Sequence, residues 1–181
     1  MGETEQRPGS VTRVTDPGRF HVLHEAAEDL LDQLTEGYVV DRREAKEPLG
    51  NGVETIRTVR LIPRNPAAGP LSIAFTDFPG VVLRLGRWFV EPLPDCGCDE
   101  CEEDPAELVT DLRVRVAAHV EGGLWERVRR GLSSSWLETR LIGPGFRTSR
   151  QAPVDAAEAR AARREGFAAP VQWAPWPRRA P

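Results

Sequence analysis

The most regular pattern of apolar and polar positions predicts a helix near the start of the chain. Asp16-Pro17 joins an N-cap residue to a proline at the first helical position, which is typical of a helix start, and Gly37 supplies the stop. Between these points apolar residues recur on one face of a wheel at about 100° per residue. That face carries Phe20, Leu23, Ala27, Leu30, Leu31 and Leu34. We therefore predict an amphipathic helix from Asp16 to about Glu36 that packs against a core.

A β-like pattern follows this helix. Apolar and β-branched residues alternate with polar ones in short segments, and turn signals such as Phe78-Pro79-Gly80 separate them. We predict strands at Tyr38 to Arg42, Val53 to Pro63, Leu71 to Phe75, Val81 to Leu85 and Trp88 to Val90. Because the connections are short, an antiparallel meander of about four or five strands is favoured.

The cap-and-proline pattern recurs at Asp104-Pro105 and predicts a second amphipathic helix that ends at Gly122-Gly123. Its apolar stripe consists of Leu108, Val109, Leu112, Val116 and Val120. A final hairpin is predicted from Leu124 to Val128 and Trp136 to Ile142, and Gly143-Pro144-Gly145 should end it. The chain lacks the strict βαβ alternation of a doubly wound sheet. The predicted class is α+β, an antiparallel sheet plus a C-terminal hairpin packed with two amphipathic helices.

A length of 181 residues fits one domain. We expect a flexible leader over residues 1–14, a single α+β domain over 15–150, and a peripheral helix and Pro/Trp-rich tail over 151–181. The tail contains Trp173-Ala174-Pro175-Trp176-Pro177. It resembles a proline-rich partner motif, but two exposed indoles would be unusual, so we favour docking of the tryptophans on the protein's own domain.

Charge and hydropathy exclude several classes of protein. The net charge is only −4, so no strong field favours binding to nucleic acid or to an anionic membrane. No stretch approaches the ~20 apolar residues that span a bilayer, and the polar first residues do not form a signal peptide. We therefore expect a cytoplasmic protein without nucleic-acid or membrane partners. In that reducing compartment, clustered cysteines indicate metal or redox chemistry more readily than a disulfide framework.

The sharpest chemical feature is the cluster of Cys96, Cys98 and Cys101. Cys98 and Cys101 have the C-x-x-C spacing that binds one tetrahedral ion, and Cys96 adds a third sulfur. Gly97 eases the sharp backbone bend that such chelation needs. The cluster therefore indicates a zinc site with three ligands from one loop, which requires a fourth ligand from elsewhere.

We take His24 as the candidate fourth ligand, because it lies at the edge of the first helix's apolar face. His119 should be out of reach, about 14 residues along the second helix and so ~20 Å from its start. Asp95 or Asp99 could coordinate locally, although structural zinc prefers nitrogen and sulfur ligands.

Other interpretations of the thiols stay open. They include reduced thiols or an incidental disulfide, a redox dithiol of Cys98 and Cys101, and soft-metal sensing or transport. Acidic residues flank the cluster on both sides, which raises thiol pKa values and disfavours a catalytic nucleophile unless a cation is present. The chain also lacks a Gly-rich phosphate loop, a nucleophile elbow and an H-E-x-x-H motif.

These features together are similar to a family of small actinobacterial proteins that carry a C-G-C-D-x-C motif. The similarity extends from about Asp16 to the C-terminus and includes Trp88, the run from Pro94 to Cys101, Gly122-Gly123 and Trp176-Pro177-Arg178-Arg179. No activity is assigned to that family, so the resemblance implies a shared fold and cysteine cluster and transfers no catalytic residue. We expect a non-enzymatic interaction protein with a protein partner, the identity of which the sequence leaves open together with the oligomeric state. The alternative is an enzyme or redox protein that uses the Cys98/Cys101 dithiol.

Overall fold

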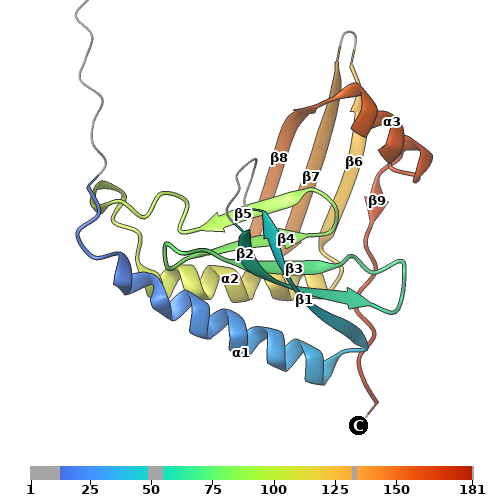
Figure 1. The fold of residues 1–181 in the computed structure, drawn as a ribbon. Coiled ribbons are helices and arrows are strands. Elements are labelled where there is room, and N and C mark those ends of the chain that lie inside the picture. The colour runs from blue at the N-terminus through green and yellow to red at the C-terminus, as the bar shows by residue number, and fades with distance from the viewer. Residues whose placement is uncertain (1–12, 49–54, 132–133, 181) are drawn as a thin grey trace, which may run out of the picture.

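The computed structural model describes residues 13–48, 55–131 and 134–180, and Figure 1 shows how their helices and strands are arranged. The first sheet is an antiparallel meander of β1 (Val40–Pro48), β2 (Thr55–Pro63), β3 (Leu71–Phe75), β4 (Val81–Leu85) and β5 (Phe89–Leu93). A second antiparallel sheet contains β6 (Leu124–Arg130), β7 (Ser135–Gly143), β8 (Phe146–Val154) and β9 (Val171–Gln172), in the order β8-β7-β6-β9. The helices are α1 (Val22–Gly37), α2 (Pro105–Val120) and α3 (Ala156–Arg164). The predicted α+β class and the meander are confirmed.

The two long helices begin in different ways, although the sequence has the same signal at both. Asp104 caps α2, because its carboxylate accepts a hydrogen bond from the Ala106 backbone N–H at 2.9 Å. Asp16 makes no such bond, and the chain forms a 3₁₀ turn, Pro17–His21, before α1 begins. The expected cap at Asp16 is therefore wrong, although proline does occupy the first turn as predicted.

The main core lies between the first sheet and the helices α1 and α2, which run side by side along it (Figure 1). Cross-strand register places apolar residues in rows on one face of the sheet. One such row is Leu61, Leu71, Leu85 and Phe89, all buried. The helices contribute the residues that the wheel predicts, among them Leu23 and Leu31 from α1 and Leu112 and Val116 from α2. Alternation in the strands and helical spacing in α1 and α2 thus meet in one core.

The second sheet is larger than the predicted hairpin. The Gly143-Pro144-Gly145 segment does not end the sheet but forms a tight turn into β8, in which Gly143 pairs with Phe146 and Gly145 adopts φ +79°. Because β8 carries mostly exposed polar residues, its sequence has no clear strand pattern. At the far end α3 packs on β6 (Figure 1), around a small second core of Val128, Ala159, Ala162 and Phe167.

The C-terminal tail docks on its own domain, as predicted. Trp176 is 4% exposed, and its indole N–H donates to the Gly69 carbonyl at 2.9 Å. Beyond it, Arg178 pairs with Tyr38 in an isolated β-bridge beside the end of α1. The tail therefore belongs to the core, and strand β8 runs across the expected boundary at residue 150. Residues 1–12 of the expected leader, and Val53 and Glu54 of a predicted strand, lie outside the described residues.

A buried carboxylate joins the two sheets. Glu126 of β6 has no exposed surface, and its Oε1 accepts from the backbone N–H groups of Trp88 at 2.8 Å and Phe89 at 3.2 Å. Its Oε2 accepts from the Arg87 N–H at 2.9 Å and from the Trp173 indole at 2.8 Å. Burial raises the pKa of Glu126, although the four hydrogen bonds act in the opposite direction. One side chain thus holds the β4–β5 turn, the second sheet and the tail together.

We expect Glu126→Ala to lower the free energy of unfolding by about 3 kcal/mol or more, because four buried or partly buried donors lose their acceptor. Glu126→Gln should have an intermediate effect, since its one carbonyl oxygen replaces only one of two acceptor atoms. Urea unfolding followed by tryptophan fluorescence measures both. Glu121→Ala is the control, because its ion pair with Arg178 is exposed and should contribute about 1 kcal/mol or less. Equal effects of Glu126→Ala and Glu121→Ala would contradict the joining role of Glu126.

His119 of α2 is a second buried polar group. Its side chain has no exposed surface, and its Nε2 lies 2.9 Å from the Gly69 carbonyl oxygen and 3.1 Å from that of Pro70. Since both partners are acceptors, Nε2 carries a proton. The buried Nδ1 has no hydrogen-bond partner among the described residues, which favours the neutral ring. Burial lowers the pKa of His119 to about 4.

We expect this pKa to make stability depend on pH in a defined window. Between pH 6.5 and 4 the unfolded chain binds a proton at His119 that the folded protein does not, so stability falls as the pH falls. The loss attributable to His119 at pH 4 is about 3 kcal/mol. It is measured as the difference between urea unfolding curves of the wild type and His119→Gln at several pH values. Parallel pH profiles for the two proteins would show that His119 does not titrate in this way.

Candidate metal centre

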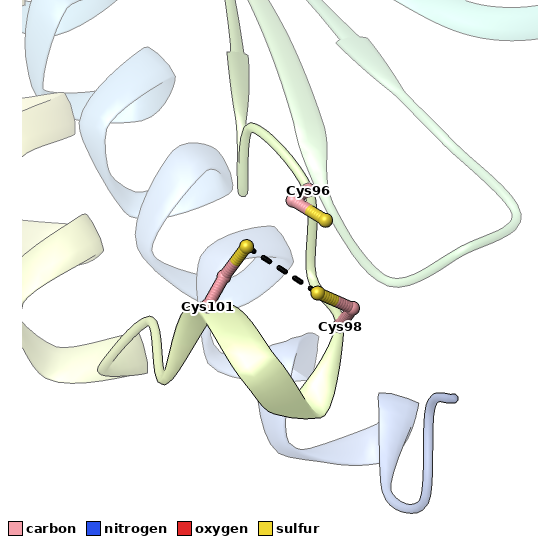
Figure 2. Close-up of side chains that lie close together, drawn as sticks. All are labelled: Cys96, Cys98 and Cys101. Atoms are coloured by element: carbon pink, nitrogen blue, oxygen red, sulfur yellow. Dashed lines mark hydrogen bonds between the residues drawn. The ribbon is translucent and has the colours of Figure 1, made fainter. Parts of the chain in front are cut away.

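The three cysteines lie in the loop between β5 and α2, and their sulfur atoms point toward one another (Figure 2). All three Sγ atoms lie within 4.8 Å of one another, and Cys98 Sγ is 3.3 Å from Cys101 Sγ. Tetrahedral zinc with Zn–S bonds of 2.3 Å places its sulfur ligands about 3.8 Å apart. The observed separations bracket that value, so small side-chain movements suffice to bind one ion.

Local backbone geometry brings the thiols together. Residues Asp99–Cys101 form a 3₁₀ turn, and the Cys101 N–H donates to the Cys98 carbonyl at 3.3 Å. This turn places both sulfurs of the C-x-x-C pair on the same side. Cys98 is buried, whereas Cys96 and Cys101 are exposed. The cluster therefore has one sulfur anchored in the protein and two that are open to solvent.

Gly97 is required by its surroundings as well as by its conformation. Its φ of +72° lies in the left-handed region, and a Cβ atom there would lie 2.6 Å from Cζ of Phe78. The expectation that glycine allows the sharp bend between Cys96 and Cys98 is consistent with this geometry. The close approach of Gly97 to the Phe78 ring packs the cysteine loop against the β3–β4 connection.

Glu103 holds the first half of the loop. Its carboxylate accepts from the backbone N–H groups of Asp95 at 2.9 Å, Cys96 at 3.3 Å and Gly97 at 2.8 Å. Burial acts to raise the pKa of Glu103, but these three donors outweigh burial and the pKa is lowered. Sequence reasoning counted Glu103 only as one of several acidic neighbours, because hydrogen bonds to a backbone six to eight residues earlier have no sequence signature.

Asp99 is also engaged within the protein. Its carboxylate accepts from the Thr15 hydroxyl at 2.5 Å and from the Thr15 backbone N–H at 3.0 Å, and its own N–H donates to the Arg13 carbonyl. These bonds to Thr15, supported by the charges of Arg19 and Arg13, lower the pKa of Asp99. The carboxylates of Glu103 and Asp99 are therefore bound to the chain rather than directed at the sulfur atoms.

The thiols influence one another's ionisation. Hydrogen bonds from the Cys96 and Cys101 side chains lower the pKa of Cys98. The same interactions with Cys98 and Cys96 raise the pKa of Cys101 to about 12. Three thiolates at this spacing would need a cation to balance their charge, which a metal ion bound by the three sulfur atoms would supply.

The candidate fourth ligand His24 does not lie with the cysteines. Its Nε2 is 2.8 Å from the Gly80 carbonyl oxygen, and its ring packs edge-on against Phe75 at 5.3 Å between centroids. Over the described residues, the metal-ligating group contains only Cys96, Cys98 and Cys101. His119 lies at the far end of α2 from the cysteine loop, where it is hydrogen-bonded to Gly69. This position agrees with the expectation that His119 is out of reach of the cysteines. Among the residues that the structure describes, none beyond the three cysteines joins this group, so a tetrahedral ion here would need one further ligand.

The fold and the site thus define an α+β protein with a three-thiol cluster on its surface. The chain belongs to a family described as a family of unknown function (DUF6226), whose model matches residues 2–180. Membership of a family without an assigned function agrees with the expectation from the sequence. No curated protein and no solved structure matches the chain. Within the described segments, none of the helices has the length and apolar character that crossing a membrane requires.

We expect Glu103→Gln to loosen the loop. The glutamine amide keeps one carbonyl oxygen but turns an N–H₂ group toward backbone donors, so the Cys96 and Gly97 amides lose protection. Their hydrogen exchange, measured by NMR, should accelerate about tenfold. Glu100→Gln is the matched control, since it removes the same charge from an exposed side chain in the same loop. If both variants accelerate exchange equally, the loop responds to charge and not to the Glu103 hydrogen bonds.

Proposed function

We propose that Cys96, Cys98 and Cys101 bind one zinc ion and that the protein acts by binding a protein partner rather than by catalysis. The observation that carries the proposal is the convergence of three sulfur atoms within 4.8 Å. Thiolates are preferred ligands of zinc, and three of them from one loop supply three of the four ligands of a structural zinc site. The ion would join Cys96 to the 3₁₀ turn and so close the loop.

The surroundings of the thiols support a structural ion. A catalytic zinc site also has three protein ligands and an open position, and its bound water needs a nearby proton acceptor. Here the carboxylate of Glu103 accepts three backbone hydrogen bonds, and that of Asp99 accepts two from Thr15. These engaged carboxylates favour a role in shaping the loop over a role in activating water.

The loop also forms part of a surface suited to binding. Gly97 packs against Phe78, which is 37% exposed and lines a pocket of about 290 Å³ together with Pro92 and Pro94. A zinc ion that holds Cys96 would hold this apolar wall in place, which is how we relate the metal to a protein partner. The proposal places the protein in the cytoplasm, where its three free thiols stay reduced.

The test is elemental analysis of protein purified without a metal-affinity tag. We expect about one zinc ion per chain in the wild type and less than about a tenth of that in Cys98→Ser, because two thiols alone make a weak site. His24→Gln is the control and should retain the metal, since His24 contacts Gly80 and Phe75 instead. Less than a tenth of an equivalent of any transition metal in the wild type would refute the proposal.

A second candidate function is favoured by the 3.3 Å separation of the Cys98 and Cys101 sulfur atoms. Two thiols this close can form a disulfide, giving two protons and two electrons to an oxidant such as oxidised dithiothreitol. A metal-free protein that forms this bond reversibly, seen as the loss of two hydrogen atoms by mass spectrometry, would favour redox chemistry. A protein that keeps its zinc and resists oxidation would favour the structural ion.

A further inference from the structure

A second pocket lies at the other end of the molecule, between the end of the second sheet and α3. Its volume is about 530 Å³. Its polar lining comes from the last residue of β6, the first residue of β7, the residue before β7, and α3. These side chains are Arg130, Ser134, Ser135, Arg160 and Arg163. In Figure 1 this region, marked by α3 and the upper ends of β6 and β7, lies far from the start of α1.

The pocket carries a concentrated positive charge. Three guanidinium groups line it, and none of its lining residues has a carboxylate. The nearest acidic side chains along the chain are engaged elsewhere. Asp155 caps α3 by accepting from the N–H groups of Ala157 and Glu158, and the carboxylates of Glu158 and Glu165 contact Arg87. Within the described segments, the three arginines of the pocket have no ion-pair partner.

The donors in the pocket are arranged by the fold. Arg163 Nη2 donates to the Ser135 hydroxyl oxygen at 2.6 Å, which fixes one guanidinium group against the first residue of β7. That hydroxyl keeps its own proton to donate to a ligand. Cross-strand pairing of Ser135 with Arg130 and with Val154 brings the three strand ends to one place. The site therefore has one positioned arginine, two exposed arginines and two hydroxyl groups.

Another arginine-lined pocket shows by contrast why this one is the better anion site. Arg60, Arg84 and Arg87 surround Ser72 on the first sheet, but that pocket has a volume of only about 160 Å³. Arg60 lies 3.6 Å from a Glu47 carboxylate oxygen, and Arg87 lies 3.0 Å from one of Glu158. Carboxylates thus neutralise most of the charge there, whereas the pocket beside α3 keeps its charge available.

We propose that the pocket beside α3 binds the phosphoryl group of a small polar molecule of the sugar-phosphate class. Arginine matches phosphate oxygens with paired, charge-assisted hydrogen bonds, and serine hydroxyls add neutral donors. The volume lies in the range of small-molecule sites, about 300–1,000 Å³, and leaves room beyond a single phosphate. Five of the eight lining residues are arginine or serine and the other three are small, so a polar remainder of the ligand fits the pocket best. The inference is independent of the metal site.

The test is calorimetric titration of the full chain with ribose 5-phosphate, inorganic phosphate and ribose, at an ionic strength held constant with sodium chloride. We expect saturable binding of ribose 5-phosphate, weaker binding of inorganic phosphate, and no binding of ribose. The double variant Arg130→Gln/Arg160→Gln should bind ribose 5-phosphate at least about tenfold more weakly.

Arg164→Gln is the matched control, because it removes one positive charge from an exposed residue of α3 outside the pocket. Its affinity should stay within about twofold of the wild type. Both altered pocket arginines are exposed, so thermal unfolding should show the variants as stable as the wild type. The proposal is overturned if ribose 5-phosphate does not bind the wild type saturably, if ribose binds as well, or if Arg164→Gln and the single variant Arg160→Gln weaken binding equally.

Discussion

The structure depends on one buried carboxylate. Glu126 sits where the β4–β5 turn, strand β6 and the C-terminal tail meet, and its two oxygens accept hydrogen bonds from Arg87, Trp88, Phe89 and Trp173. A carboxylate without partners in this place would be strongly destabilising, and four donors offset that cost. The second sheet therefore has a fixed position against the first, since no apolar contact is as directional as this group of hydrogen bonds.

The tail completes the same junction. Trp173 donates to Glu126, and three residues later Trp176 donates to Gly69 and contacts His119 at 5.9 Å between ring centroids. The loop that contains Gly69 thus receives a histidine from α2 and a tryptophan from the last residues of the chain. This arrangement makes residues far apart in the sequence part of one core, so removal of the tail would expose buried groups in both sheets.

The two candidate binding sites share a principle of construction although their charges differ. At the cysteine loop, Glu103 and Asp99 hold the backbone and leave the sulfur atoms free to meet an ion. At the pocket beside α3, Arg163 is hydrogen-bonded to Ser135. The neighbouring carboxylates of Glu158 and Glu165 form ion pairs with Arg87 instead of with the arginines of the pocket. In each site some charged groups are bound within the protein, and the groups that can meet a ligand remain available: the thiols in one site and the guanidinium groups in the other.

Part of this fold was predictable because it follows from local periodicity. The apolar stripe and the Asp104-Pro105 cap place α2 at Pro105–Val120, and alternation places β3 and β4 at the predicted residues. Strand β8 was not predictable, because it lies at an edge of the second sheet, where exposed residues such as Arg147 and Gln151 need no alternation. The absence of a side-chain cap at Asp16 also has a non-local cause. The residues before it, Arg13 and Thr15, form hydrogen bonds with Asp99, which is distant in the sequence.

The sequence by itself determined the α+β class, the meander, and the grouping of three cysteines in one loop, because each depends on residues that are close along the chain. Only the tertiary structure decided that His24 turns to Gly80, that Glu103 holds the loop, and that Glu126 joins the sheets. It also decided that Arg130, Arg160 and Arg163 share a pocket. These partners lie between 6 and 56 residues apart, and no spacing rule links them: hydrogen bonding and burial choose the partner of each polar group only once the elements have packed.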